Sequence, residues 1–156
     1  MTLMRRGLLS DYFEGVAVKR LSVVETDATR SNQHEFQGSQ PLRQLLGVDD
    51  RRGIPTRFIW LGGEQEGIAE EGFLSWSNVR KGKPRAPEYH LYYSGNPVTE
   101  IMQAGDTLFL ALCRDGTAMA IVVPADSTIQ NQLMWLFGLE AQPGLQFVAK
   151  DFKPDD

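Results

Sequence analysis

A short stretch near the beginning of the chain, residues 30–38 (RSNQHEFQG), concentrates side chains that donate and accept hydrogen bonds. It contains an arginine, amides, a histidine and a carboxylate, and it ends at a glycine that can turn the chain. Planar groups of this kind read base edges in the DNA major groove: Asn and Gln suit adenine, Arg and His suit guanine, and Glu accepts from cytosine. A solvated loop can have the same composition, so both interpretations stay open at this point.

A second polar segment, residues 80–93 (RKGKPRAPEYHLYY), begins with RKGKPR, which holds four cations and no acid. Gly82, Pro84 and Pro87 disfavour a regular element there. Clustered cations contact DNA phosphates, which position a protein on the duplex and supply much of its affinity. Either segment alone is also typical of a solvated loop. Together they suggest two arms, projected from a rigid scaffold, that hold a duplex from two sides.

The chain has 156 residues, of which 42% are hydrophobic and 23% charged, as expected for one globular domain. We predict a single domain over residues 1–150 and a polar tail, or the start of an interdomain linker, over residues 151–156. The formal net charge of −4 argues at first against nucleic acid. However, the acids dominate only after residue 93, where the cations are Arg114, Lys150 and Lys153. A basic patch can lie on an acidic protein because the surface field depends on local charge density.

Between the polar segments, apolar patterns predict a mainly β (α+β) fold of about seven strands with closing helices. The absence of βαβ alternation favours a mixed, mostly antiparallel barrel or sandwich. The Asp-Gly pair at residues 115–116 predicts a hairpin. Trp135 is expected to lie in the core, and Cys113 is expected to be a buried thiol. The expected strands cover residues 16–21, 56–62, 73–79, 90–95, 106–113, 118–124 and 145–150. The expected helices cover residues 39–47, capped by Ser39 or Gln40, and residues 126–138, capped by Asp126 or Ser127.

The sequence gives little support for catalysis. His34 and His90 have no metal-binding spacing, and no nucleophile elbow, phosphate-binding loop or dinucleotide fingerprint occurs. Adjacent residues on an extended chain point apart, so His34 and Glu35 are not expected to act as a pair. Residues 151–153 (DFK) have the letters of a metal-dependent nuclease motif, but we place them in a tail that cannot present them on a sheet. We predict no catalytic residues, no metal ligands and no enzyme activity for this chain alone.

The sequence also indicates a cytoplasmic protein without a membrane partner. Its apolar runs fall short of the roughly 20 residues of a membrane span. Asp11 and Glu14 follow the N-terminal cations too closely for a signal peptide.

Residues 19–38 (KRLSVVETDATRSNQHEFQG) and 88–97 (EYHLYYSGNP) carry a resemblance to a known family. They resemble the N-terminal effector domain of EcoRII-type (Type IIE) restriction endonucleases, over roughly residues 10–150. The resemblance implies a DNA-binding pseudobarrel similar to the plant B3 fold, with two arms that grip the major groove at a short site such as CCWGG. It also implies a bacterial protein with a separate C-terminal nuclease domain, and Mg²⁺ as a cofactor of that domain only.

The resemblance places one arm at residues 30–34 and the other at residues 80–90. The family pattern has a histidine beside a glutamine in the first arm. In this chain Asn32 takes that place and His34 follows two residues later, so either can be the base contact. The expected base-reading residues are Asn32, Gln33, His34, Arg85, Glu88 and His90. The expected phosphate or arm residues are Lys19, Arg30, Ser31, Arg80, Lys81, Lys83 and Tyr89.

Three functions are compatible with these patterns. The leading hypothesis is sequence-specific binding of double-stranded DNA without cleavage. The alternative is a protein–protein or autoinhibitory module whose basic arm docks on a catalytic domain. A third is a small-ligand barrel enzyme that uses His34 or His90.

Overall fold

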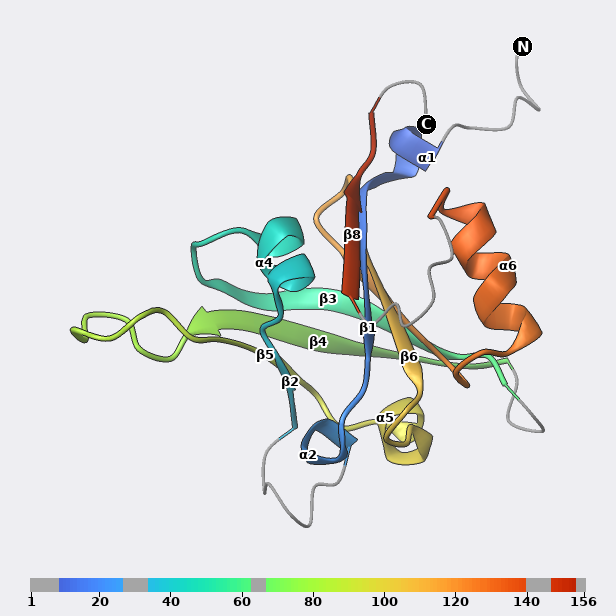
Figure 1. Cartoon of the computed structure of the whole chain (residues 1–156), viewed down its shortest axis with the longest axis horizontal. Helices are drawn as coiled ribbons and strands as arrows, with labels where there is room; N and C mark the ends of the chain where they lie inside the picture. Colours follow the sequence, from blue (N-terminus) through green and yellow to red (C-terminus); the bar gives the residue numbers. More distant parts are fainter. Residues whose placement is uncertain (1–8, 27–33, 63–66, 140–146, 154–156) are drawn as a thin grey trace.

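The fold is one mixed sheet that curls into a half-barrel (Figure 1). The computed structural model describes residues 9–26, 34–62, 67–139 and 147–153. The strands are β1 (Phe13–Arg20), β2 (Glu35–Gln37), β3 (Arg51–Trp60), β4 (Ile68–Asn78), β5 (Tyr89–Tyr93), β6 (Thr107–Cys113), β7 (Ala118–Val123) and β8 (Phe147–Asp151). They follow the order β2-β5-β4-β3-β7-β6-β1-β8, and neighbours are antiparallel except for the parallel pair β3 and β7. The mainly β prediction is confirmed.

The alternation of side chains sets which face of the sheet is buried. In β3, Ile54, Thr56 and Phe58 are buried, whereas the intervening Arg57 is exposed. The predicted hairpin joins β6 to β7, and Gly116 in its turn has a φ of 90°, which favours glycine. The strand periodicity of the sequence is therefore realised in the sheet.

Strand β6 is buried on both faces because it lies between two apolar clusters. Leu108 and Leu110 face the interior of the half-barrel, in the same cluster as Trp76. Phe109 belongs to a second cluster on the other face, together with Met134 of the C-terminal helix. Two-sided burial explains why this strand is a continuous apolar run instead of an alternating one.

Five short helices lie in the described part of the chain: α1 (Leu9–Tyr12), α2 (Val23–Thr26), α4 (Gln40–Leu46), α5 (Pro97–Ile101) and α6 (Thr128–Leu136). Both predicted helices are confirmed. The first begins after Ser39 as α4 and contacts β1 and β8. The second begins after Ser127 as α6, and the Ser127 hydroxyl accepts a hydrogen bond from the Gln130 amide at 3.1 Å. No helix among these residues is both long and apolar enough to cross a bilayer.

Edge strand β2 is tied to β1, near the far side of the sheet, by a buried ion pair. Lys19 of β1 pairs with Glu25 of α2, and the two residues are 4% and 2% exposed. The Lys19 ammonium also donates to the Gln37 carbonyl at 3.2 Å. The Glu25 carboxylate accepts from the backbone amides of Gln37 at 2.7 Å and Ser22 at 2.8 Å. We call this arrangement the Lys19–Glu25 clasp, because it joins β1, α2 and β2 through side chains.

Two predictions about the core are wrong. Trp135 is 81% exposed, because α6 turns Met134 and Phe137 toward the sheet instead. Cys113 is partly exposed at the end of β6. The expected polar tail also differs from the structure, since Asp151 ends β8 and Phe152 is 5% exposed within an aromatic cluster. Our reason for setting aside residues 151–153, that they cannot lie on a sheet, therefore does not hold for Asp151.

Candidate functional site

The loop that joins β4 to β5 projects from one end of the sheet (Figure 1). We call residues 80–87 the basic loop. Its base is fixed by the Asn78 side chain, whose oxygen accepts from the backbone amides of Arg80 at 2.9 Å and Glu88 at 3.1 Å. Val79 N also donates to Glu88 O at 2.8 Å. The β4–β5 ladder thus continues to the start of the loop and holds its two ends together.

The cations of the basic loop fall into two groups. Arg80 binds the Glu88 carboxylate at 2.9 Å, and Lys81 lies 3.8 Å from that of Asp50. Lys83 and Arg85 are exposed and form no hydrogen bond or ion pair through their side chains with any described residue. Their charges are therefore available to an external anion.

A chain of charged groups runs from the basic loop to β2. Arg80 contacts Glu88, Glu88 contacts His90 Nε2 at 3.1 Å, and His90 Nδ1 contacts Glu35 at 2.9 Å. A neutral imidazole has one N–H and donates to one carboxylate, whereas a protonated ring donates to both. This network fixes the orientation of both carboxylates and of the His90 ring at the surface.

The basic loop and His34 lie at opposite ends of β5. In β5, Tyr89, Leu91 and Tyr93 are buried, so His90 and Tyr92 point outward. The basic loop adjoins the Tyr89 end of this strand. At the other end, the exposed His34 ring stacks on the Tyr93 ring, with centroids 5.2 Å apart. Five residues of strand separate the two ends by about 14 Å, and because His34 contacts the inward-pointing Tyr93, it lies on the opposite face of the strand from His90.

The described part of the chain contains some of the predicted site residues and not others. Arg30, Ser31, Asn32 and Gln33 lie outside the described residues. His34, Arg85, Glu88 and His90 all reach the surface, and His90 is bonded to Glu88. As expected, His34 and Glu35 point apart: His34 stacks on Tyr93, whereas Glu35 bonds to His90.

Lys19 and Tyr89 must be removed from the predicted phosphate contacts. Lys19 is held inside the molecule by Glu25 and cannot reach a ligand on the surface. Tyr89 is 5% exposed, its ring stacks on Trp76 at 4.9 Å, and its hydroxyl donates to Val48 O at 2.9 Å. Both residues therefore support the fold beneath the site.

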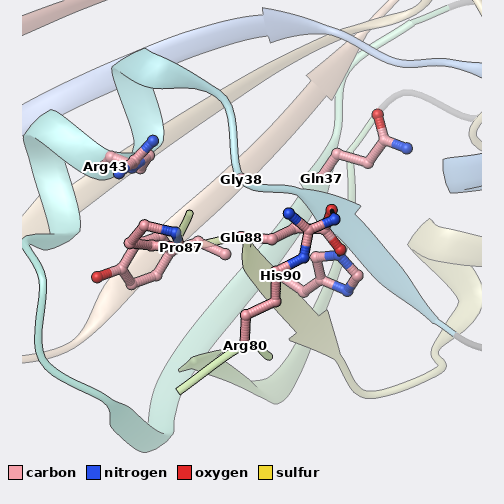
Figure 2. Close-up of a pocket in the computed structure, with 8 residues that line it drawn as sticks. Gln37, Gly38, Arg43, Arg80, Pro87, Glu88 and His90 are labelled. Carbon is pink, nitrogen blue, oxygen red and sulfur yellow. Dashed lines mark hydrogen bonds and ion pairs between the residues drawn. The ribbon is translucent and has the colours of Figure 1, made fainter. Parts of the chain in front are cut away.

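Sequence reasoning missed Arg43, which lies beside the basic loop. A cavity of about 440 Å³ separates α4 from the loop base, and its wall includes Arg43, Arg80, Glu88 and His90. Figure 2 shows Arg43 on α4 at one side of this cavity and Arg80 with Glu88 and His90 at the other. The sequence offered no signal for this, because the polar face of α4 meets the loop only after both elements have packed.

No three His, Cys, Asp or Glu side chains gather into a possible metal site within the described ranges. A scan against models of known protein families finds no match, and a search of curated proteins finds no significant match. The interpretation of the site therefore rests on its geometry and on the sequence patterns.

Tyr93, beneath His34, makes the stability of this region depend on pH. Burial, with the nearby carboxylates of Glu25 and Glu35, raises the pKa of Tyr93 to about 12. Its hydroxyl donates to Glu25 O at 2.8 Å, which a phenolate cannot do. Because this pKa exceeds the unfolded value of about 10, the stabilising contribution is complete below pH 10 and is lost as the pH rises through 12.

We expect Tyr93→Phe to remove that dependence. Between pH 10 and 12, the free energy of unfolding of the wild type should fall more steeply than that of Y93F, by on the order of 2 kcal/mol. Urea unfolding at a series of pH values measures the difference. Parallel curves for the two proteins across this range would contradict the prediction.

Proposed function

We propose that this chain binds double-stranded DNA sequence-specifically, through the outer face of β2 and β5 and the basic loop. The observation that carries the proposal is the pair of exposed cations, Lys83 and Arg85, on a projecting loop with no partner among the described residues. Surface cations of this kind neutralise phosphates and release counterions, which is the main source of affinity for a duplex.

The face next to the loop supplies the groups that read bases. Both residues reach the surface, so a carboxylate oxygen of Glu88 can accept from cytosine N4, and His90 Nε2 can donate to guanine N7 when it exchanges its bond to Glu88 for one to the base. Their orientation is set in advance by Arg80 and Glu35, so ordering them on binding costs little entropy. Asn32 and Gln33 would add adenine contacts from the segment that precedes His34.

The resemblance of residues 19–38 and 88–97 supports a narrower proposal. We infer a B3-like effector domain of a restriction endonuclease, which reads a short CCWGG-like site in the major groove and leaves cleavage to a nuclease domain of the full-length protein. The curled sheet and the loop at its end are compatible with such a clamp. A cytoplasmic bacterial location and Mg²⁺ dependence of the nuclease domain belong to the same proposal.

Fluorescence anisotropy with a CCWGG duplex and a scrambled duplex, each measured across a range of salt concentrations, tests the function. We expect tighter binding of the cognate duplex at every salt concentration and a linear fall of log affinity with log salt. Equal affinities for the two duplexes throughout would end the claim of specific reading. No binding of either duplex at low salt would end the claim of DNA binding.

Lys83→Ala and Arg85→Ala form a matched pair that separates affinity from specificity. Both residues are exposed and lie two positions apart on the basic loop. K83A should weaken both duplexes equally and reduce the salt slope by about 0.9. R85A should cost about 1 to 3 kcal/mol on the cognate duplex and less on the scrambled one. Arg57→Ala, an exposed cation paired with Glu71, is the control and should change neither.

The same exposed cations favour a second candidate function, docking on an acidic partner domain. Charge reversal of Lys83 and Arg85 would then abolish partner binding in the absence of DNA. Retention of partner binding by the reversed variant would argue against it. The third possibility, a small-ligand enzyme, would require turnover by the isolated chain with added Mg²⁺.

A further inference from the structure

The guanidinium group of Arg43 is held in a fixed position at the cavity between α4 and the basic loop. It lies over the ring of Tyr89, 5.0 Å from the centroid, and Tyr89 in turn stacks on Trp76. Trp76 is 0% exposed, and its indole N–H donates to Gly47 O at 3.0 Å. This three-layer stack connects the core to the cavity wall and orients the Arg43 fork before any ligand arrives.

Arg43 also lines the cavity wall without a described carboxylate that neutralises its charge. It forms no ion pair with any residue of the described ranges, whereas Arg80 is paired with Glu88. His90 is bonded to both Glu88 and Glu35, so the two carboxylates already have partners. A partly buried guanidinium without an anion beside it favours the entry of one.

Arg80 retains donors for the same anion. Its Nη2 donates to Glu88 and its Nη1 to Ala86 O at 3.3 Å, which uses two of the five guanidinium N–H groups. The remaining donors can bind a second acceptor. Figure 2 places Arg43 on one side of the cavity and Arg80 on the other, so both guanidinium groups border the space that an anion would enter.

We propose that a single phosphate group binds between Arg43 and Arg80. Two planar forks suit the tetrahedral oxygens of phosphate better than they suit a halide. The cavity is far larger than a phosphate ion, so it has room for the sugars on either side of a phosphodiester. That this group is a backbone phosphate of bound DNA rests on the proposed function. Inorganic phosphate has the same chemistry and can bind in the same place.

Amide-resolved NMR titration tests the site without DNA. Sodium phosphate and sodium chloride are added at matched ionic strength to the wild type, Arg43→Gln, Arg43→Lys and the control Arg57→Gln. We expect phosphate-specific shifts at Gly38, Arg43, Arg80 and His90 in the wild type and in R57Q. R43Q should lose about tenfold or more in phosphate affinity. R43K should fall in between, because it keeps the charge and loses the fork. Urea unfolding of each variant verifies that it is folded.

The salt dependence of duplex binding then identifies the source of the phosphate. R43Q should reduce the salt slope by about 0.9, the contribution of one phosphate contact. If the wild type binds no duplex but phosphate still binds through Arg43, the proposed function fails and the site stands with free phosphate as its ligand. An R43-dependent loss in either assay supports the site. The proposal is overturned if phosphate and chloride shift the wild type alike and R43Q does not alter the duplex salt slope.

Discussion

Glu25→Ala is expected to lower the free energy of unfolding by about 3 to 5 kcal/mol. The substitution leaves the Lys19 ammonium buried without a counter-charge, at 4% exposure. It also removes the acceptor of two backbone amides, Gln37 N and Ser22 N. Domains of this size are stable by only about 5 to 15 kcal/mol, so this single change should remove a large part of the margin.

A double-substitution cycle separates the two causes. Lys19→Met with Glu25→Gln removes both charges and keeps a side-chain oxygen for a backbone amide, so we expect it to recover much of the loss seen in E25A. Urea unfolding followed by circular dichroism gives each value. The exposed pair Arg57 and Glu71, 3.1 Å apart, provides the control, and its removal should cost at most about 1 kcal/mol.

If E25A proves too unstable to study, E25Q alone gives the charge effect. The clasp does not hold β2 in place if E25Q lowers the free energy of unfolding no more than removal of the exposed Arg57–Glu71 pair does. The cycle also bears on the surface, because the clasp fixes Gln37, which lies at the edge of the cavity.

Local patterns were sufficient to predict seven of the eight strands of the described chain, the helix caps and the β6–β7 hairpin, since each depends on neighbouring residues. They missed β2 (Glu35–Gln37), which lies in the segment expected to be a polar arm and is a strand only because it pairs with β5. They failed where a distant partner decides the environment. The resemblance placed Lys19 among the phosphate contacts, whereas its burial depends on Glu25 in a separate helix. No local pattern indicated that these two side chains would meet inside the molecule.

Two other errors could have been avoided by stricter use of periodicity. In YHLYY, a buried Leu91 requires Tyr89 to face the same side, because strand side chains alternate. In α6, successive residues are about 100° apart, so Met134, Trp135 and Leu136 cannot all face the core. Arg43 is different, because its role depends on how α4 packs beside the basic loop, which no local rule supplies.

Trp76→Ala is expected to reduce both stability and phosphate binding. The ring is fully buried, and its removal should cost about 3 to 5 kcal/mol in free energy of unfolding. Without it, Tyr89 loses its stacking partner, and Arg43 loses the rigid support beneath its guanidinium. Phosphate affinity, measured by NMR at a temperature where the variant is folded, should therefore fall as well.

Trp76→Phe and Trp60→Phe provide a matched comparison that isolates the stack. Each loses an indole hydrogen bond to a backbone carbonyl, Gly47 O in one case and Gly62 O in the other. The two variants should lose similar stability, about 1 to 3 kcal/mol, because a carbonyl is left without its donor. W76F keeps an aromatic ring under Tyr89 and W60F lies on β3 away from the cavity wall, so both should bind phosphate nearly as the wild type does. If W60F weakened phosphate binding as much as W76A, the loss would reflect general destabilisation, and the support of Arg43 by Trp76 would be refuted.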